Sequence, residues 1–414
     1  MAATTPSINQ ALARRQRVLA PTYRLFYEQP VHIVRAEGVW MYDADGRRYL
    51  DAYNNVPVVG HCNPEVVARM SKQAATLNTH TRYITDGPVE LAERLLATMP
   101  SELTSVTFTC TGSESNDLAV RISKAATGGT GFIVTEAAYH GTTETLSGMS
   151  PVTGVELAPN VFAIEAPLTV ESASGFGTRV RACIDKMRAV GIKPAGLLVD
   201  TIFGSDGVIS HPPGFLRAAV EEIHRAGGLF IADEVQPGFG RTGDAMWGFQ
   251  RHGVTPDLVT MGKPMGNGHP VAALVARTEA MTEFGRTRRY FNTFGGNTVS
   301  CAAALAVLDV IQRDKLIDNA RETGAYLQKR LRALAGNLPR IREIRGAGLF
   351  VGVQMESRDL AARAVNDLRH EGVLIGSAGR NADVLKIRPP LTIGKSEIDL
   401  LVAALESVLR RVAF

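Results

Sequence analysis

Residues 228–235 read GLFIADEV, an apolar run that ends in two adjacent acids. Runs of this length and composition are typical of buried strands. Helical stretches separate this run from four similar ones between residues 60 and about 310: SVTFTCT (105–111), TGFIVTEA (130–137), AGLLVDTIF (195–203) and PDLVTMG (256–262). Because strand and helix alternate, the sequence predicts an α/β fold with a mostly parallel central sheet. Ligands of such sheets bind at the carboxyl ends of the strands.

The chain before this region predicts a small β-rich segment. Residues 31–55 alternate apolar and polar positions around an Asp45–Gly46 turn, which is a strong signal for a β-hairpin. A segment this small cannot hold a hydrophobic core of its own. We therefore expect residues 1–59 to pack against another part of the chain.

The chain after this region predicts a second α+β unit. It has a long helical pattern at 311–336, strand candidates at 348–355 and 384–389, and a closing amphipathic helix at 396–412. The expected organisation is an N-terminal segment and a C-terminal segment that together form a small domain beside the large one. The N-terminal segment is expected at residues 1–59, the large domain at 60–310 and the C-terminal segment at 311–414.

Composition and charge exclude several classes of protein. Of the 414 residues, 45% are hydrophobic and 21% charged, and the net charge is +4 with basic residues spread along the chain, so neither disorder nor nucleic-acid binding is indicated. The four cysteines form no CxxC pair, and we expect neither a metal site nor a disulfide framework. No signal-peptide core and no apolar stretch of roughly 18 residues is present. A cytoplasmic enzyme without a membrane partner is expected.

A candidate phosphate site lies where one predicted strand ends and a helix begins. There the chain reads Cys110-Thr111-Gly112-Ser113-Glu114. A Gly-Ser turn that opens a helix presents free backbone N–H groups at the positive end of the helix dipole, which suits an anion. An ordinary helix N-cap would use the same residue types, so the motif alone leaves both interpretations open.

Two further candidates follow predicted strands. Asp233 and Glu234 end the strand at 228–235, and because side chains alternate along a strand only one of them can point into a site. That carboxylate could bind a metal, pair with a basic nitrogen or cap the strand. Lys263 follows the strand at 256–262 with glycines on both sides. It could be a desolvated nucleophilic amine or a lysine in a surface turn.

The combination of motifs is more informative than any one of them. Tyr139-His140-Gly141 adds an aromatic pair after a strand, and Lys263 follows Asp233 by 263 − 233 = 30 residues. An anion site, an aromatic ring, an acid and a lysine are the parts that a pyridoxal phosphate site needs. GFGRTG (238–243) matches a dinucleotide fingerprint in letters only, because it leads into a loop and not into a helix.

These motifs, in this order, resemble those of the class III pyridoxal phosphate-dependent aminotransferases, which have fold type I. The resemblance covers nearly the whole chain, from GVWMYDADGRRYLDAYNNVPVVGHCNPEVV through TGSES, AAYHGTT, IADEVQPGFGRTG, TMGKPMGNGHPVAA and TFGGNTVS to PPLTI. It implies a large domain with a mostly parallel sheet and a smaller α+β domain built from both termini. It also implies pyridoxal 5'-phosphate as the cofactor.

The resemblance assigns residues to the cofactor's phosphate and to its surroundings. Gly112 and Ser113 would bind the phosphate, while Val235 and Gln236 match positions under the ring and near its phenolic oxygen. In the family, the threonine of TFGGN reaches the phosphate of the neighbouring subunit, a role that falls on Thr293. A homodimer is therefore expected, and pairing of dimers into a tetramer stays open.

The resemblance also assigns the catalytic residues. Tyr139 would stack on the ring with His140 beside it, and Asp233 would pair with the ring nitrogen. Lys263 would form the Schiff base and carry protons as general acid and base. The implied reaction transfers an amino group from an amine or amino acid to a 2-oxo acid. A non-catalytic protein on this fold is disfavoured because the lysine, the aspartate and the phosphate-binding serine are all present.

The substrate end departs from the common family pattern, in which an arginine three residues before Pro-Pro grips the α-carboxylate. Lys386 stands there, and a lysine does not replace the bidentate fork of an arginine. In amine transaminases of the family a mobile arginine slightly upstream serves instead, and Arg380 could take that role or could be a solvated loop residue.

The second interpretation is elimination. YNNVPVVGHCNPEVV and DVLKIRPPL resemble the phospho-lyase branch of the family, whose members release phosphate from phosphoethanolamine or phosphohydroxylysine. Lys386 and Arg388 would suit a phosphate or a phosphonate, and elimination needs no 2-oxo acid. Asp200 stands where most relatives have a glutamate followed by proline, which also indicates an unusual pocket. Amino transfer is the leading expectation and elimination is the alternative.

Overall fold

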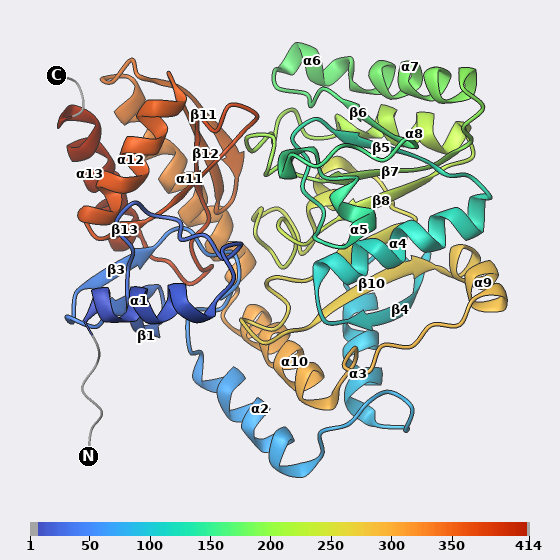
Figure 1. Cartoon of the computed structure of the whole chain (residues 1–414), viewed down its shortest axis with the longest axis horizontal. Helices are drawn as coiled ribbons and strands as arrows, with labels where there is room; N and C mark the ends of the chain where they lie inside the picture. The colour runs from blue at the N-terminus through green and yellow to red at the C-terminus, as the bar shows by residue number, and fades with distance from the viewer. Residues whose placement is uncertain (1–6, 412–414) are drawn as a thin grey trace.

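The computed structural model describes residues 7–411, and its largest element is a seven-stranded sheet in the order β4-β10-β9-β8-β7-β5-β6 (Figure 1). Only β10 runs antiparallel to its neighbours, so the mostly parallel sheet is confirmed. Five of the strands were predicted, whereas β6 and β10 were not. The strands are β4 (Leu103–Thr109), β5 (Gly131–Thr135), β6 (Val161–Ile164), β7 (Pro194–Asp200), β8 (Leu229–Asp233), β9 (Leu258–Met261) and β10 (Ala272–Arg277).

Helices cover both faces of this sheet. On one face, α4 (Gly112–Thr127) and α9 (Thr278–Thr287) share a core with strand residues such as Ile231. On the other, α7 (Phe176–Ala189) and α8 (Leu216–Arg225) share a core with Phe230 and Ala232. This alternation along β8 decides which way its last side chains point.

The two smaller sheets lie beside the large one (Figure 1). The hairpin predicted at Asp45–Gly46 joins β2 to β3, and β13 from the C-terminal part of the chain pairs in parallel with β3. The N-terminal segment therefore completes a sheet with the C-terminal one, while the domain boundaries at 59/60 and 310/311 stay a prediction. The strands are β1 (Ile33–Glu37), β2 (Trp40–Asp43), β3 (Arg48–Asp51) and β13 (Val373–Leu374), and in the second sheet β11 (Ile341–Ala347), β12 (Phe350–Met355), β15 (Val384–Ile387) and β14 (Gly376–Ala378).

The long helix predicted at 311–336 is wrong in one respect, because it is two helices. α10 (Thr298–Arg313) ends and α11 (Leu316–Ala335) begins around Lys315, whose φ of +49° is left-handed and turns the chain. The helix α10 begins at Asn297, whose side chain accepts hydrogen bonds from two backbone N–H groups of the first turn. The apolar pattern runs through the bend, so periodicity alone does not reveal it.

The remaining helices are mostly short or peripheral. The closing helix is α13, and Val412 of its predicted range lies outside the described residues, as do residues 1–6, 413 and 414. None of the helices between Ser7 and Arg411 is long and apolar enough to cross a membrane. The remaining helices are α1 (Ile8–Val18), α2 (Pro64–Thr76), α3 (Asp86–Leu96), α5 (Glu144–Ser147), α6 (Val170–Ser174), α12 (Arg358–His370), α13 (Lys395–Arg411) and the 3-10 turns Pro151–Thr153 and Gly248–His252.

The GFGRTG loop fastens the large sheet to the small domain. Arg241 is fully buried, and its guanidinium donates to the backbone carbonyls of Leu349 and Pro389. The loop therefore has a structural role, because it connects the large sheet to the C-terminal part of the chain.

Candidate active site

Most of the predicted cofactor residues line one pocket near the carboxyl ends of the large sheet. Asn116 and Gly141 line the same pocket and were missed by sequence reasoning. The predicted residues that line it are Gly112, Ser113, Tyr139, His140, Asp200, Asp233, Val235 and Gln236.

Of the two adjacent acids Asp233 and Glu234, Asp233 is the one that faces this pocket. Its Oδ2 accepts from Asn116 Nδ2 at 2.9 Å and lies 2.7 Å from His140 Nδ1, while Oδ1 accepts from the backbone N–H of Val235 at 3.1 Å. Both oxygens are therefore acceptors, and the carboxylate is fixed in place. His140 Nε2 is buried without a hydrogen-bond partner.

Glu234 points to the opposite face, as strand alternation requires. Its carboxyl group is fully buried and accepts from Thr201 Oγ1 and from the backbone N–H groups of Gly248 and Phe249. Burial raises the pKa of Glu234 to about 7. Glu234 therefore connects Thr201 to the backbone at residues 248 and 249 on that opposite face, and its side chain does not enter the pocket.

Lys263 follows β9, next to the strand that carries Asp233. Lys263 is exposed at the surface of this structure, but nearby protein reduces the hydration of its amine, which lowers the pKa of that amine. The charge of Asp233 opposes this shift, and that of Arg388 adds to it. A lysine with a lowered pKa has more of the neutral, nucleophilic amine near neutral pH.

The anion-binding end is the first turn of α4. Thr111 caps the helix by accepting from the N–H of Glu114 at 3.1 Å, which leaves Gly112 and Ser113 at the start of the helix. Ser113 Oγ accepts from the N–H of Thr142 at 3.2 Å. An anion site, the ring of Tyr139 and a fixed carboxylate share one pocket, and the charge of that carboxylate acts on the amine of Lys263. This set of groups fits pyridoxal phosphate.

Gly112 is required at its position because of Val235. A Cβ at residue 112 would lie 2.8 Å from Val235 Cγ2 and 3.0 Å from Cγ1. Gly112→Ala is expected to weaken cofactor binding about tenfold, because overpacking costs about 1–3 kcal/mol and the added Cβ would press on both methyl groups of Val235. Titration of the apoenzyme with pyridoxal phosphate measures this.

A second substitution makes this expectation specific. Gly112→Ala combined with Val235→Ala should recover most of the affinity, whereas Gly285→Ala, where a Cβ meets nothing within 4 Å, should not change it. Equal loss in the single and double variants would contradict the steric explanation.

The substrate end holds two buried cations. Lys386 Nζ donates to the carbonyl of Gly204 at 3.1 Å, and the N–H of Gly204 donates to Asp200 Oδ2 at 2.9 Å. Arg388 donates to Gln236 Oε1 at 2.6 Å. Burial, followed by the charge of Arg388, lowers the pKa of Lys386 well below its usual range.

Five predicted residues are not among those that line this pocket: Lys263, Lys386 and Arg388, described above, and Arg380 and Thr293. Arg380 is 71% exposed at its side chain and forms an ion pair with Glu136 at 2.6 Å. Thr293 is exposed on the loop before α10. A role for Arg380 in substrate binding and for Thr293 in a neighbouring site stay predictions.

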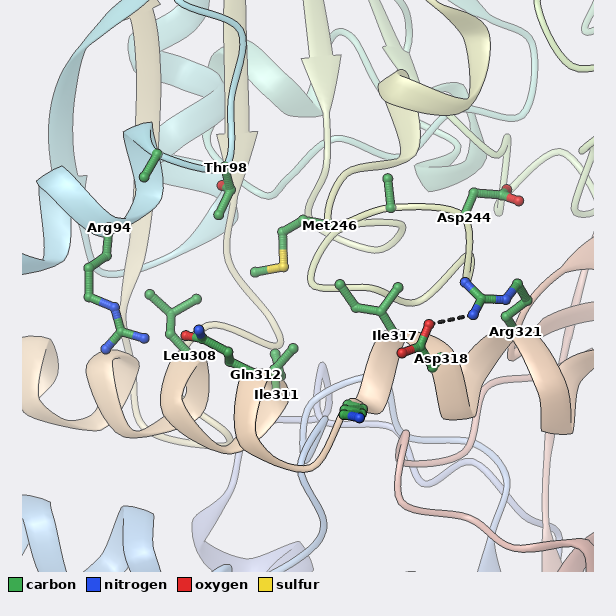
Figure 2. Close-up of a pocket in the computed structure, with 13 residues that line it drawn as sticks. Arg94, Thr98, Asp244, Met246, Leu308, Ile311, Gln312, Ile317, Asp318 and Arg321 are labelled. Atoms are coloured by element: carbon green, nitrogen blue, oxygen red, sulfur yellow. Dashed lines mark hydrogen bonds and ion pairs between the residues drawn. The ribbon is translucent and has the colours of Figure 1, made fainter.

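A larger cavity lies elsewhere, at the bend between α10 and α11 (Figure 2). It is lined by apolar side chains such as Met246 and Leu308, and some of its charged residues are already in ion pairs, among them Asp318 with Arg321. None of the predicted site residues lines it. Cavity size therefore does not identify the chemical centre of this molecule.

Comparison with known proteins agrees with the site. Residues 25–409 match the model of the family described as aminotransferase class-III. The chain is 36% identical to alanine–glyoxylate aminotransferase 2 homolog 2 of Arabidopsis thaliana, and the alignment covers 97% of this chain and 88% of that protein. It is 34% identical to ethanolamine-phosphate phospho-lyase homolog 1 of Caenorhabditis elegans, with 97% and 94% covered.

A solved structure adds to these relatives. A phospholyase from Arthrobacter in complex with phosphoethanolamine superposes with a TM-score of 0.93 and 41% identity, over 97% of this chain and 99% of that one.

Proposed function

The chain belongs to the class-III aminotransferases, a family of pyridoxal phosphate enzymes, and from this we propose that it eliminates phosphate and ammonia from a small phosphorylated primary amine. The observation that carries the proposal is the buried pair of Lys386 and Arg388, in which Lys386 stands where the common family pattern has a carboxylate-binding arginine. The similarity to a phospholyase that binds phosphoethanolamine supports it.

Charge supports a phosphate more than a carboxylate. Lys386 and Arg388 are both at most 9% exposed, and the charge of Arg388 lowers the pKa of Lys386. Asp200 is the acid whose charge acts on both. A dianionic phosphate neutralises two buried cations, whereas one carboxylate leaves an uncompensated charge, which is costly in a buried site.

The site's own residues divide the work of such a reaction. Bound pyridoxal phosphate draws electrons from the carbon next to the substrate nitrogen, so that a proton can leave that carbon. The amine of Lys263 takes this proton, Asp233 holds the ring nitrogen, and Lys386 with Arg388 hold the departing phosphate. The bond between the following carbon of the substrate and the ester oxygen breaks, and its electron pair leaves with the phosphate. Water then releases ammonia and a carbonyl compound.

Amino transfer to a 2-oxo acid is the second candidate. The 36% identity to an alanine–glyoxylate aminotransferase homolog favours it, and Arg388 could bind a carboxylate. This reaction leaves the amino group on the cofactor after one turnover. It then needs a 2-oxo acid, whereas elimination does not.

The deciding experiment follows ammonia and inorganic phosphate during incubation of the holoenzyme with phosphoethanolamine, without any 2-oxo acid. Continuous release of both in equal amounts is the expected result. A reaction that stops after one turnover until pyruvate is added would establish amino transfer and overturn the proposal. 2-Aminoethylphosphonate serves as the control, because its carbon–phosphorus bond cannot release phosphate by this route.

Lys386→Met is expected to lower kcat/KM for phosphoethanolamine about 10–100-fold. It removes a charged contact to phosphate, and hydrogen bonds to charged groups are worth about 1.5–3 kcal/mol. Initial rates of phosphate release at saturating cofactor measure the effect. Lys395→Met, which removes an exposed lysine at the start of α13, is the matched control and should not change the rate. An unchanged rate in Lys386→Met would remove this lysine from the substrate site.

We also propose a homodimer. The loops around residues 80–84 and 291–294 lie together, with Arg82 over the ring of Phe291 at 3.9 Å. Large apolar side chains are exposed on them, including Ile84 at 100% and Phe294 at 68%, and Thr293 lies among these. Exposed apolar patches of this kind mark interaction surfaces. Sedimentation should give a particle of twice the chain's mass, and a monomer would contradict the proposal.

A further inference from the structure

We propose that Asn116, oriented by Thr260, is the residue that positions Asp233 for the cofactor's ring nitrogen. Asn116 is 1% exposed and Thr260 is fully buried, and neither was among the predicted site residues. The inference concerns cofactor binding and holds for elimination and amino transfer alike.

Both polar groups of the Asn116 side chain have hydrogen-bond partners. Its Nδ2 donates to Asp233 Oδ2 at 2.9 Å and to the backbone carbonyl of His140 at 2.8 Å. Its Oδ1 accepts from the hydroxyl of Thr260 at 2.5 Å. The side-chain amide is therefore fully satisfied, as a buried amide must be.

These partners allow only one orientation of the amide. A flipped amide would place Oδ1 against two acceptors, the carboxylate of Asp233 and the carbonyl of His140. The hydroxyl of Thr260 reinforces the observed orientation by donating to Oδ1. Thr260 thus acts on Asp233 through Asn116, which makes both of them positioning residues and not catalytic ones.

The sequence explains why Asn116 can reach so many parts of the site. Asn116 and Gly112 are four residues apart in α4 and so lie on the same face of the helix, where Gly112 faces Val235. Asp233 and Thr260 are paired residues of the neighbouring parallel strands β8 and β9. One side chain therefore links the phosphate-binding helix, the strand of the carboxylate and the strand that leads to Lys263.

The backbone carbonyl of His140 links Asn116 to a fourth part of the site. It belongs to the loop that carries Tyr139, the residue expected to stack on the cofactor ring. Loss of Asn116 would leave this carbonyl and one lone pair of Asp233 without a donor in a buried place, at a substantial cost. The carboxylate would then be held only by His140 Nδ1 and the N–H of Val235, and less firmly in the position that the ring nitrogen requires.

The test compares two ligands that differ at one atom. Apoenzyme is titrated with pyridoxal phosphate and with its 1-deaza analogue, in which carbon replaces the ring nitrogen. Asn116→Ala is expected to weaken binding of pyridoxal phosphate about 10–100-fold, the range for a charge-assisted hydrogen bond. Binding of the analogue, which makes no contact from that atom to Asp233, should change less than about twofold.

The Thr260 variants test the orienting step. Thr260→Val keeps the shape but removes the donor, and it should weaken pyridoxal phosphate about threefold to tenfold while sparing the analogue. Thr260→Ser keeps the hydroxyl and should restore most of the affinity. Thermal unfolding of each apoenzyme shows whether the fold is retained.

Ser115→Ala is the matched control. Ser115 is the neighbouring residue of α4, is fully buried, and shares a hydroxyl hydrogen bond of 2.7 Å with Thr109, but it does not contact Asp233. It should cost stability without discriminating between the two ligands. Equal weakening of both ligands by Asn116→Ala or Thr260→Val would overturn the proposal, because a purely structural defect does not distinguish one ring atom.

Discussion

Replacing Lys263 by alanine is expected to lower turnover by more than about a thousandfold, the upper part of the range for loss of a general acid or base. Two functions are lost together, because this amine would bind the cofactor's aldehyde and would also move the substrate proton. No other lysine is placed to replace it, since Lys386 is already hydrogen-bonded to Gly204. Steady-state rates at saturating cofactor, with phosphoethanolamine and with an amine plus pyruvate, measure the loss in either reaction.

Addition of methylamine distinguishes a missing amine from a damaged fold. Activity of Lys263→Ala should rise with methylamine concentration, because a small amine can enter the space left by the side chain. Lys193→Ala, which removes an exposed lysine bonded to the carbonyl of Thr127, should behave as the native protein. If Lys263→Ala retained more than a tenth of native turnover, this lysine would not be the catalytic amine.

Asp233→Asn is expected to lower kcat/KM about 10²–10³-fold, comparable to removal of one preorganised electrostatic contact at a reacting centre. The amide is nearly isosteric but carries no charge for the ring nitrogen. It also presents donor hydrogens toward Asn116 Nδ2 or His140 Nδ1, which already occupy the carboxylate. Rates at saturating cofactor, together with the affinity for pyridoxal phosphate, separate weaker binding from slower chemistry.

Asp257→Asn controls for loss of a buried acid on the same strands. Asp257 lies just before β9, at the opposite end of the sheet, and accepts from the N–H of Phe230 at 2.8 Å. Its loss should destabilise the fold without changing cofactor affinity. A similar kinetic defect in both variants would mean that Asp233 acts through stability alone.

The large sheet could be predicted because five strands are apolar runs bounded by turns, although only the 3-10 turn Gly248–His252 lies between β8 and β9. The antiparallel strand β10 breaks the expected alternation of strand and helix, since residues 262–271 join it to β9 without a helix. The strand β6 has four residues, as β9 does, and was missed although all four are apolar. The bend at Lys315 was missed because the apolar periodicity continues through it.

Most of the predicted cofactor residues line one pocket because they belong to short motifs at the ends of neighbouring strands, while their roles toward the cofactor stay predictions. Asn116 could not be predicted, because its importance depends on contacts with residues 24, 117 and 144 positions away. It does lie one helical turn after Gly112, and this spacing is the one signal that could have identified it. The position of Arg380 on Glu136 depends on how two parts of the chain meet, which no local pattern encodes.

The back-to-back arrangement of Asp233 and Glu234 limits how this enzyme can evolve. Substitutions around the pocket can alter which amine it accepts, because they leave the strand register intact. A deletion or insertion of one residue within β8 would exchange the two acids and turn Glu234, whose pKa burial raises to about 7, toward the cofactor. New specificities should therefore arise through side-chain replacement and through changes in loop length, while the lengths of β8 and β9 stay fixed.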